Sequence, residues 1–581
     1  MVSDARALAT RLADLGDAAL ARTLAARGVS PQSGWHDFFD AAEGLLDPAS
    51  IDRALTHLDR RDLTALHSTT PADTDPGRRD GRPTLLALVD EDGNAYTQVA
   101  ERVAAAATAA PDAFRPTGPP PAALPAEPKA AAAAAERAFT TAGSLADILL
   151  ACLHTPLART GAGPVSAVDR RRLRDAGALE FADELEDLLG SAADAGLAVA
   201  HEREWTVTEA GERWLEAPTP LRWETIAEGF RAELPDGLRT PANGFLVPAA
   251  WADVYPLDPE WPARADQLRR MGVRWGLFGA DDSAAEFPWT AALRAGEPAD
   301  AATMAAYLPA EIDRVYLQAD LTAIAPGPLA PALDLRLRSI AVRESRAQAS
   351  TYRFTAASVG AGMTEGETAA SMRAFLAELS LTGIPQPLDY LIESTAARHG
   401  LVRVSADDAT GRTRVDSSDA GLLEAIAIDQ ALRPLGLLVL EGDHALSSRV
   451  ARDAVYWSLA DARYPVVALD ATGAPESIHR RTAATPSVPA AAPEATYARL
   501  IRTLRGGHGT QGEAGWLERE LEQAVRARAE IVVVVRMPDG AERSFTLEAA
   551  GLGGGRLRGR DRAADIERTL PVSSIVSVGA V

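Results

Sequence analysis

Lysine is the residue type whose scarcity limits the chemistry of this chain most. The 581 residues include one lysine, Lys129, which follows Pro128. A nucleotide-binding P-loop ends in Gly-Lys-Ser/Thr, because its lysine must reach the β- and γ-phosphates. Lys129 does not stand in such a loop. The sequence therefore predicts no ATPase motor of this kind, no lysine-dependent kinase site and no Asp/Glu-x-Lys nuclease site.

Alternating arginines near the C-terminus form the second candidate for chemistry. Arg556, Arg558 and Arg560 are two residues apart, which would place them on one face of a strand. Guanidinium groups in a row suit contact with phosphate, so these three are the candidate nucleic-acid or anion-binding residues. The alternative is an edge strand that its charge keeps soluble. The nearby Asp561 and Asp565 favour that alternative.

Three further patterns resemble ligand sites but fail on spacing or context. Residues 507–512 match GxGxxG, yet a predicted helix precedes them where a dinucleotide site needs a strand, so we predict a connector. His201–Trp205 starts like HExxH but has tryptophan at the second histidine position. Asp90–Asn94 predicts a β-turn. The single cysteine, Cys152, excludes disulfides within the chain and cysteine-rich metal sites. We therefore expect a non-enzymatic protein with no catalytic residue, no cofactor and no metal.

The charge distribution bears on possible partners. The formal net charge is −22, which repels a phosphate backbone at long range. Residues 497–581 hold 13 arginines against 11 acidic residues, a net of +2, which leaves −24 for residues 1–496. The C-terminal segment is therefore the part least repelled by nucleic acid.

The elements that would position these residues predict an α+β multidomain protein, mainly α. We expect tandem winged-helix-like domains and a small C-terminal β-barrel. The expected divisions are a helical, winged-helix-like domain at 1–110, a Pro/Ala-rich linker at 111–136, a winged-helix domain at 137–217, a helical domain, winged-helix or not, at 218–310, a further domain at 311–475, a linker at 476–496 and a small β domain at 497–581.

Local signals support several of these elements. Asp47-Pro48 predicts a helix start, and residues 85–96 predict a hairpin. Thr364 and Glu367 predict a capping box. In 137–217 the helix in the recognition position, 180–189, is acidic, which is the wrong sign for reading a major groove. Half of the ten tryptophans fall in 218–310, where core packing is the expected role and a base-stacking platform is the alternative.

A family resemblance rests on three stretches of sequence. Val315–Leu329, Tyr352–Thr355 and Ile384–Leu388 together resemble the actinobacterial helicase-associated proteins, most strongly over 311–475. Their shared domain is similar to the N-terminal domain of XPB-type DNA repair helicases. The C-terminal module resembles a degenerate WYL-type β-barrel, with Gly555–Asp561 at the position of the naming strand but without its aromatics. WYL domains are implied sensors of ligands or nucleic acid.

The resemblance implies an accessory or scaffold protein linked to DNA repair or transcription machinery, working through protein partners such as a helicase. Two alternatives remain: direct DNA binding, and regulation by an anionic ligand bound to the WYL-like module. No apolar run reaches the ~18 residues of a membrane span, and the charged N-terminus is unlike a secretory signal. We therefore expect a cytoplasmic protein without a membrane partner.

Overall fold

The computed structural model places the buried side chains in five hydrophobic cores. The cores follow one another along the chain, except that the N-terminal core also includes side chains from residues 497–516. The structure describes residues 4–68, 81–116, 118, 122–179, 184–280, 285–345, 349–407, 410–440, 445–473, 475–476, 492–538, 540–562 and 564–580.

The N-terminal bundle is a set of short helices around one core. As predicted, Asp47 caps the fourth helix, where its carboxylate accepts from the backbone N–H groups of Ala49 (3.0 Å) and Ser50 (3.3 Å). The hairpin expected at 85–96 is reduced to a single bridge between Val89 and Ala95 around the Asp90 turn. The helices are α1 (Asp4–Asp14), α2 (Asp17–Ala26), α3 (Phe38–Leu46), α4 (Pro48–Thr56), α5 (Arg60–His67), α7 (Arg82–Leu85), α8 (Thr97–Ala109) and the 3-10 turn η2 (Pro111–Phe114).

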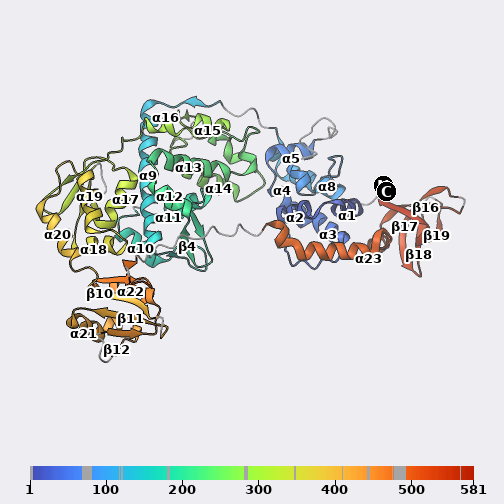
Figure 1. Ribbon diagram of the computed structural model, residues 1–581. Coiled ribbons are helices and arrows are strands. Elements are labelled where there is room, and N and C mark those ends of the chain that lie inside the picture. Colours follow the sequence, from blue (N-terminus) through green and yellow to red (C-terminus); the bar gives the residue numbers. More distant parts are fainter. Residues whose placement is uncertain are drawn as a thin grey trace.

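A helix from the far end of the chain completes this bundle. In α23 (Pro493–Ala527), the first turns bury Tyr497 and Leu504 in the N-terminal core, and Trp516 lies there as well. The Tyr497 hydroxyl donates to the carbonyl of Val29 at 2.7 Å. Figure 1 shows α23 running along the N-terminal helices to the C-terminal sheet. Residues 507–512, expected as a connector, lie inside this helix.

The central unit holds a core that runs from residue 131 to residue 304, across the expected division at 217/218. The five tryptophans of residues 218–310, Trp223, Trp251, Trp261, Trp275 and Trp289, are at most 2% exposed, which confirms core packing. Helix α9 begins at Pro128, inside the segment expected as a linker, because the alanine run after it favours helix strongly. Winged-helix identity for residues 137–217 stays a prediction.

The elements of the central unit, in chain order, are β1 (Leu124–Pro125), α9 (Pro128–His154), β2 (Leu157–Ala158), α10 (Ala167–Asp175), α11 (Leu185–Asp194), β3 (Ala198–Ala200), β4 (Glu204–Val207), α12 (Glu209–Glu216), α13 (Thr219–Ala232), η4 (Asp236–Leu238), η5 (Pro248–Asp253), α14 (Trp261–Arg274), β5 (Ala285–Glu286), α15 (Ala291–Ala295) and α16 (Ala301–Ala305). Strands β2, β4 and β3 form a three-stranded sheet in that order, and β1 pairs with β5.

Two smaller units follow, each with its own core. The third unit has a four-stranded sheet and four helices: β6 (Tyr316–Leu317), β7 (Thr322–Ala325), α17 (Pro331–Ile340), β8 (Val342–Ser345), β9 (Ser350–Arg353), α18 (Ala356–Thr364), α19 (Ala369–Leu379) and α20 (Gln386–Ala396). The fourth unit has a six-stranded sheet: β10 (Val402–Asp407), β11 (Arg412–Ser417), α21 (Ala420–Ile428), η6 (Gln430–Leu435), β12 (Leu438–Leu440), β13 (Ala445–Ser448), α22 (Arg452–Asp461), β14 (Val466–Leu469) and β15 (Pro475–Glu476).

The capping box predicted at Thr364 and Glu367 is wrong by four residues. The observed box caps α19 and consists of Thr368 and Ser371. Glu367 instead binds Arg336 of α17, with Oε1 2.8 Å from Nε, so a partner distant in sequence takes the carboxylate.

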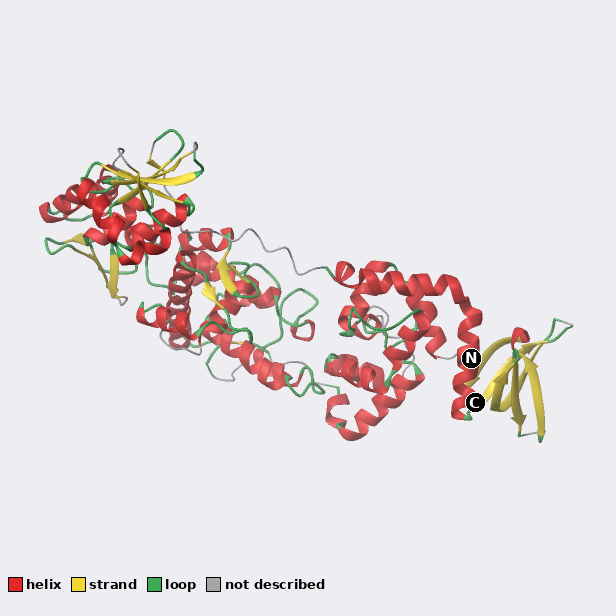
Figure 2. Cartoon of the chain, turned by 90° about the horizontal axis from the view of Figure 1, so that it is seen from below, coloured by secondary structure: helices red, strands yellow, loops and turns green. Residues whose placement is uncertain are grey.

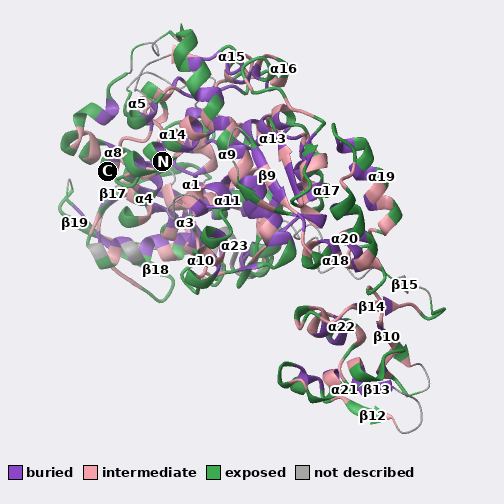
Figure 3. Cartoon of the chain, turned by 90° about the vertical axis from the view of Figure 1, so that its left-hand side faces the viewer, coloured by how far each residue is buried: buried purple, intermediate pink, exposed green. Residues whose placement is uncertain are grey.

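A buried ion cluster joins the third unit to the central unit. Asp147, on α9, is 3% exposed and accepts from Arg338 of α17 at 2.7 Å and from Arg343 of β8. Asp334 lies 3.6 and 3.7 Å from the same two guanidiniums and accepts from the Tyr352 hydroxyl at 2.5 Å. Figure 3 shows buried residues around β9 and α17, at this junction, whereas the fourth unit extends away from the rest.

The C-terminal unit is an open sheet, which corrects the expected closed barrel. Its strands are β16 (Glu530–Arg536), β17 (Glu542–Gly553), β18 (Arg556–Asp561), β19 (Ile566–Pro571) and, after the 3-10 turn η7 (Val572–Ser574), β20 (Ile575–Ala580). They pair in the order β19-β18-β17-β16-β20, and β19 and β20 do not pair within the described residues. The second half of α23 covers the apolar face with Leu517 and Leu521, so burial of that face does not require closure. Figure 2 shows this sheet and the fourth unit at opposite ends of the molecule.

Candidate functional site

The predicted arginines lie together on the outer face of β18. Along this strand exposed and buried residues alternate: Arg556, Arg558 and Arg560 are exposed, whereas Leu557 and Gly559 are buried. The period-two argument from the sequence is therefore confirmed as to the shared face. That face is turned away from α23, which packs on the Leu557 side.

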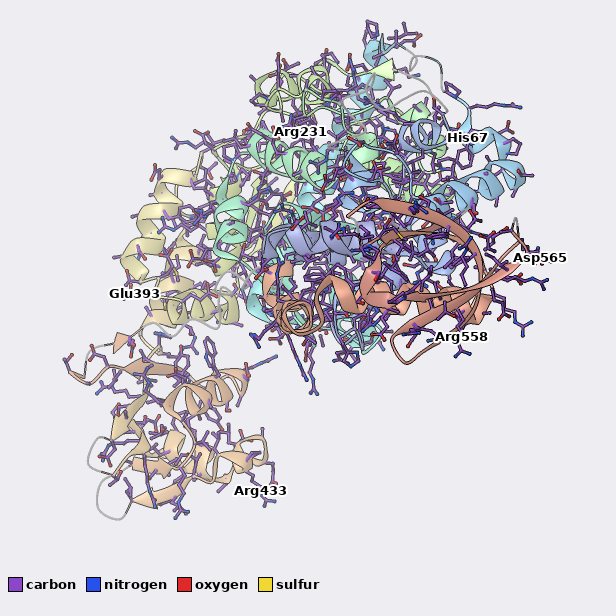
Figure 4. The ribbon with its side chains drawn as sticks, turned by 90° about the vertical axis from the view of Figure 1, so that its right-hand side faces the viewer. His67, Arg231, Glu393, Arg433, Arg558 and Asp565 are labelled. Carbon is purple, nitrogen blue, oxygen red and sulfur yellow. The ribbon has the colours of Figure 1, made fainter. Side chains whose placement is uncertain are left out.

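Only part of this arginine row is available for a partner. Arg560 pairs with Asp565 at 2.6 Å, and Arg562 pairs with Glu548 at 2.8 Å. Arg556 and Arg558, in contrast, make no ion pair within the described part of the chain. Figure 4 shows Arg558 and Asp565 on the sheet, remote from Glu393 and Arg433 of the third and fourth units. Arg556 and Arg558 therefore remain the candidate groups for contact with a phosphate or another anion.

The surroundings of the free pair are unusually open. A two-residue turn, Gly554-Gly555, joins β17 to β18 with φ values of +60° and +69°, which glycine adopts without steric cost. Across the ladder, Gly553 faces Arg556 and Gly551 faces Arg558. A Cβ at any of these glycines would meet nothing within 4 Å. Sequence analysis missed this turn, although three consecutive glycines before the alternating strand signal it.

The acidic helix of the central unit is not a free acidic surface. Within α11 and the residue before it, Glu184 and Asp187 lie 3.3 and 3.8 Å from Arg274 of α14, and Glu186 pairs with Arg170 of α10. Residues 180–183 of the predicted helix lie outside the described residues. These carboxylates bind arginines of the same unit, so their sign gives no argument about an external partner.

The other motifs have structural roles. His201 accepts or donates a hydrogen bond at 3.1 Å to the hydroxyl of Thr206, across the β3–β4 turn. Lys129 lies in the first turn of α9.

Among the described residues, no group of three or more His, Cys, Asp or Glu side chains is placed to hold a metal ion. No helix in the described ranges is long and apolar enough to cross a membrane.

The stretches that carry the resemblance build the third unit and its joint. Val315–Leu329 contains β6 and β7, which pair antiparallel, with Val315 and Leu317 in the core. Tyr352 is 1% exposed and binds Asp334 of the ion cluster. Ile384–Leu388 starts α20, whose Leu388 is buried. None of these side chains lines an open site, so the motif residues determine packing.

A family model of known proteins matches part of the chain. Residues 315–441 match the family model of the helicase conserved C-terminal domain. This segment covers the third unit and the fourth unit as far as β12. No curated protein matches the chain.

Proposed function

We propose that the protein is a helicase-associated accessory factor that has no ATPase motor of its own and acts mainly through protein contacts, with DNA repair or transcription machinery. The observation that carries the proposal is the match at 315–441 in a chain whose one lysine, Lys129, stands in the first turn of a helix. The described part of the matched segment provides a packed core and a buried joint to the central unit. Such a unit is suited to holding a partner.

Phosphate release from ATP and Mg²⁺ tests the motor part of this proposal. The purified full chain should release no more phosphate than a mock preparation, with or without single- and double-stranded DNA. Lys129→Ala is the matched variant, since it removes the only lysine and should change nothing. Release above the mock preparation would overturn the proposal, and comparison with Lys129→Ala would show whether that activity uses the lysine.

Direct DNA binding is the second candidate, and the free pair Arg556 and Arg558 favours it. Each phosphate that a protein neutralises adds about 0.9 to the slope of log K against log salt for duplex DNA. Two free arginines predict a slope near −2, hence weak binding that is detectable only at low salt. Fluorescence anisotropy of labelled DNA across a salt series measures this slope.

The strand provides its own control for that experiment. Arg556→Gln with Arg558→Gln should abolish the salt-dependent binding, whereas Arg560→Gln with Arg562→Gln, which removes guanidiniums already paired with carboxylates, should leave most of it. Equal loss in both double variants would show that general charge, and not this pair, is responsible. If the unmodified chain binds no DNA at low salt, direct DNA binding is excluded. The accessory role through protein contacts is then the proposal that stands.

A further inference from the structure

A groove in the central unit has the size and lining of a small-ligand site. Its volume is about 780 Å³, within the range of roughly 300–1,000 Å³ typical of such sites. One wall is α9 between Ala133 and Ser144, and the facing wall is the second half of α14, from Asp266 to Arg274. Glu184 and Leu188, at the start of α11, form the third side. This groove is separate from the arginine strand of the C-terminal sheet.

The groove is locally positive in a protein whose net charge is −22. Three carboxylates, on Glu136, Glu184 and Asp266, face a larger number of guanidiniums. The guanidiniums come from both helical walls: Arg137 on α9 and Arg269, Arg270 and Arg274 on α14. An oxyanion between the walls would meet donors from two directions.

Two of these arginines are not bound by carboxylates. Arg137 donates from Nε to the carbonyl of Val273 at 3.4 Å and makes no ion pair in the described ranges. The exposed Arg270 also makes no ion pair with a described residue. Arg274, in contrast, is already paired: its Nη2 lies 3.3 Å from Glu184 and its buried Nη1 lies 3.8 Å from Asp187. Arg137 and Arg270 are therefore the guanidiniums that the groove offers to a ligand.

The walls are held in place before any ligand binds. The Trp223 indole donates to the Trp275 carbonyl at 2.9 Å, and the Trp289 indole donates to the Gly276 carbonyl at 2.9 Å, so both carbonyls at the end of α14 are satisfied. Trp275 in turn donates to Ser191 of α11 at 3.0 Å. These bonds fix the end of α14 against α13 and α11, and the Thr141 hydroxyl of α9 donates to the Arg274 carbonyl at 3.2 Å. Little ordering therefore remains to oppose binding.

We propose that this groove binds a small phosphate-bearing molecule of about nucleotide size, held by Arg137 of α9 and Arg270 of α14. Phosphate suits the site better than a single carboxylate, because its tetrahedral oxygens can accept from both walls at once. A small anion suits it better than a nucleic-acid strand, because the overall charge opposes a polyanion at long range. The inference does not depend on the proposed accessory function.

Isothermal titration of the full chain with AMP, ATP, inorganic phosphate and citrate tests the proposal. AMP or ATP should bind, and Arg270→Gln should weaken that binding by about 10-fold or more, as expected for one lost charge-assisted hydrogen bond. Arg270 is exposed and carries no ion pair among the described residues, so this variant should keep its melting temperature. Arg137→Gln combined with Arg270→Gln should abolish binding.

Arg213→Gln is the matched control, since Arg213 is an exposed arginine of the same unit outside the groove. It should bind AMP or ATP as the unmodified chain does. The absence of binding by every phosphate compound at millimolar concentration would overturn the proposal. So would equal affinity in Arg270→Gln and Arg213→Gln. Citrate binding in place of the nucleotides would refute the phosphate assignment.

Discussion

Removing the Asp147 carboxylate should loosen the third unit from the central unit. In Asp147→Ala, Arg338 and Arg343 would lose their shared acceptor while remaining 21% and 16% exposed. Breaking a buried pair by deleting one partner costs roughly 3–5 kcal/mol. Asp334 stays within 3.6 and 3.7 Å of the two guanidiniums and retains part of the interaction. We therefore expect a loss of about 2–3 kcal/mol.

Urea unfolding followed by far-UV circular dichroism measures this loss. Tryptophan fluorescence shows which unit unfolds first, because the tryptophans are unevenly distributed. Residues 311–400 contain no tryptophan, whereas residues 205–289 contain seven of the ten. In Asp147→Ala the dichroism transition should therefore begin at lower urea than the fluorescence transition.

The control for this experiment is Asp175→Ala. Asp175 is 69% exposed and lies 3.6 Å from Arg171 in an i, i+4 pair, so its removal should cost less than about 1 kcal/mol. If Asp147→Ala costs no more than Asp175→Ala, the joint is not held by this cluster and the reasoning fails.

Three further predictions concern single positions. Burial raises the pKa of Glu520 to about 7 from 4.5, so its contribution to stability is fully present below pH ~4.5 and is lost as pH rises toward 7. In urea unfolding, the free energy of unfolding of Glu520→Gln should match that of the unmodified chain at pH 5 and exceed it by about 2–3 kcal/mol at pH 8. An equal gain at both pH values would contradict this. Gly276 has φ +64°, and a Cβ there would lie 2.7 Å from the Ala134 carbonyl oxygen. Gly276→Ala should therefore lower the free energy of unfolding by about 2–4 kcal/mol, measured by thermal unfolding. A change below about 1 kcal/mol would show that α9 and α14 adjust easily. Tyr497→Phe removes the hydrogen bond to Val29 and should cost about 1 kcal/mol in urea unfolding, with no loss meaning that water replaces it.

The sequence predicted elements best where the signal is local. Asp47-Pro48 starts a helix because an aspartate side chain two or three residues from the free N–H groups can reach them, whatever lies elsewhere. The shared face of Arg556, Arg558 and Arg560 follows from strand periodicity alone. Whether each guanidinium is free depends on the fold of the following turn, where Asp565 takes Arg560. The row of three was therefore predictable, but its reduction to a pair was not.

The failures concern where elements begin and what packs against them. Glu367 closes no capping box because Thr364 is the last residue of α18 and Thr368 caps α19; its carboxylate binds Arg336 instead. Residues 507–512 are rich in glycine, yet they are helical because α23 packs closely on the N-terminal bundle, where a Cβ at Gly507 would collide with the His36 carbonyl. Tertiary contact outweighs local propensity in α23. The groove arginines were missed for the same reason, since nothing in their local patterns brings Arg137 near Arg270.

The return of α23 to the N-terminal bundle imposes an order on biosynthesis. The N-terminal helices leave the ribosome first, but the helix that completes their core follows only after residues 115–492 have been translated. At ~5–20 residues per second, that interval lasts about 20–80 s. During this time the nascent bundle exposes the apolar surface that later receives Tyr497, Leu504 and Trp516. A chaperone or a co-translational partner could bind this surface on the ribosome only during this interval. The interval ends when α23 has been translated and packs on the bundle.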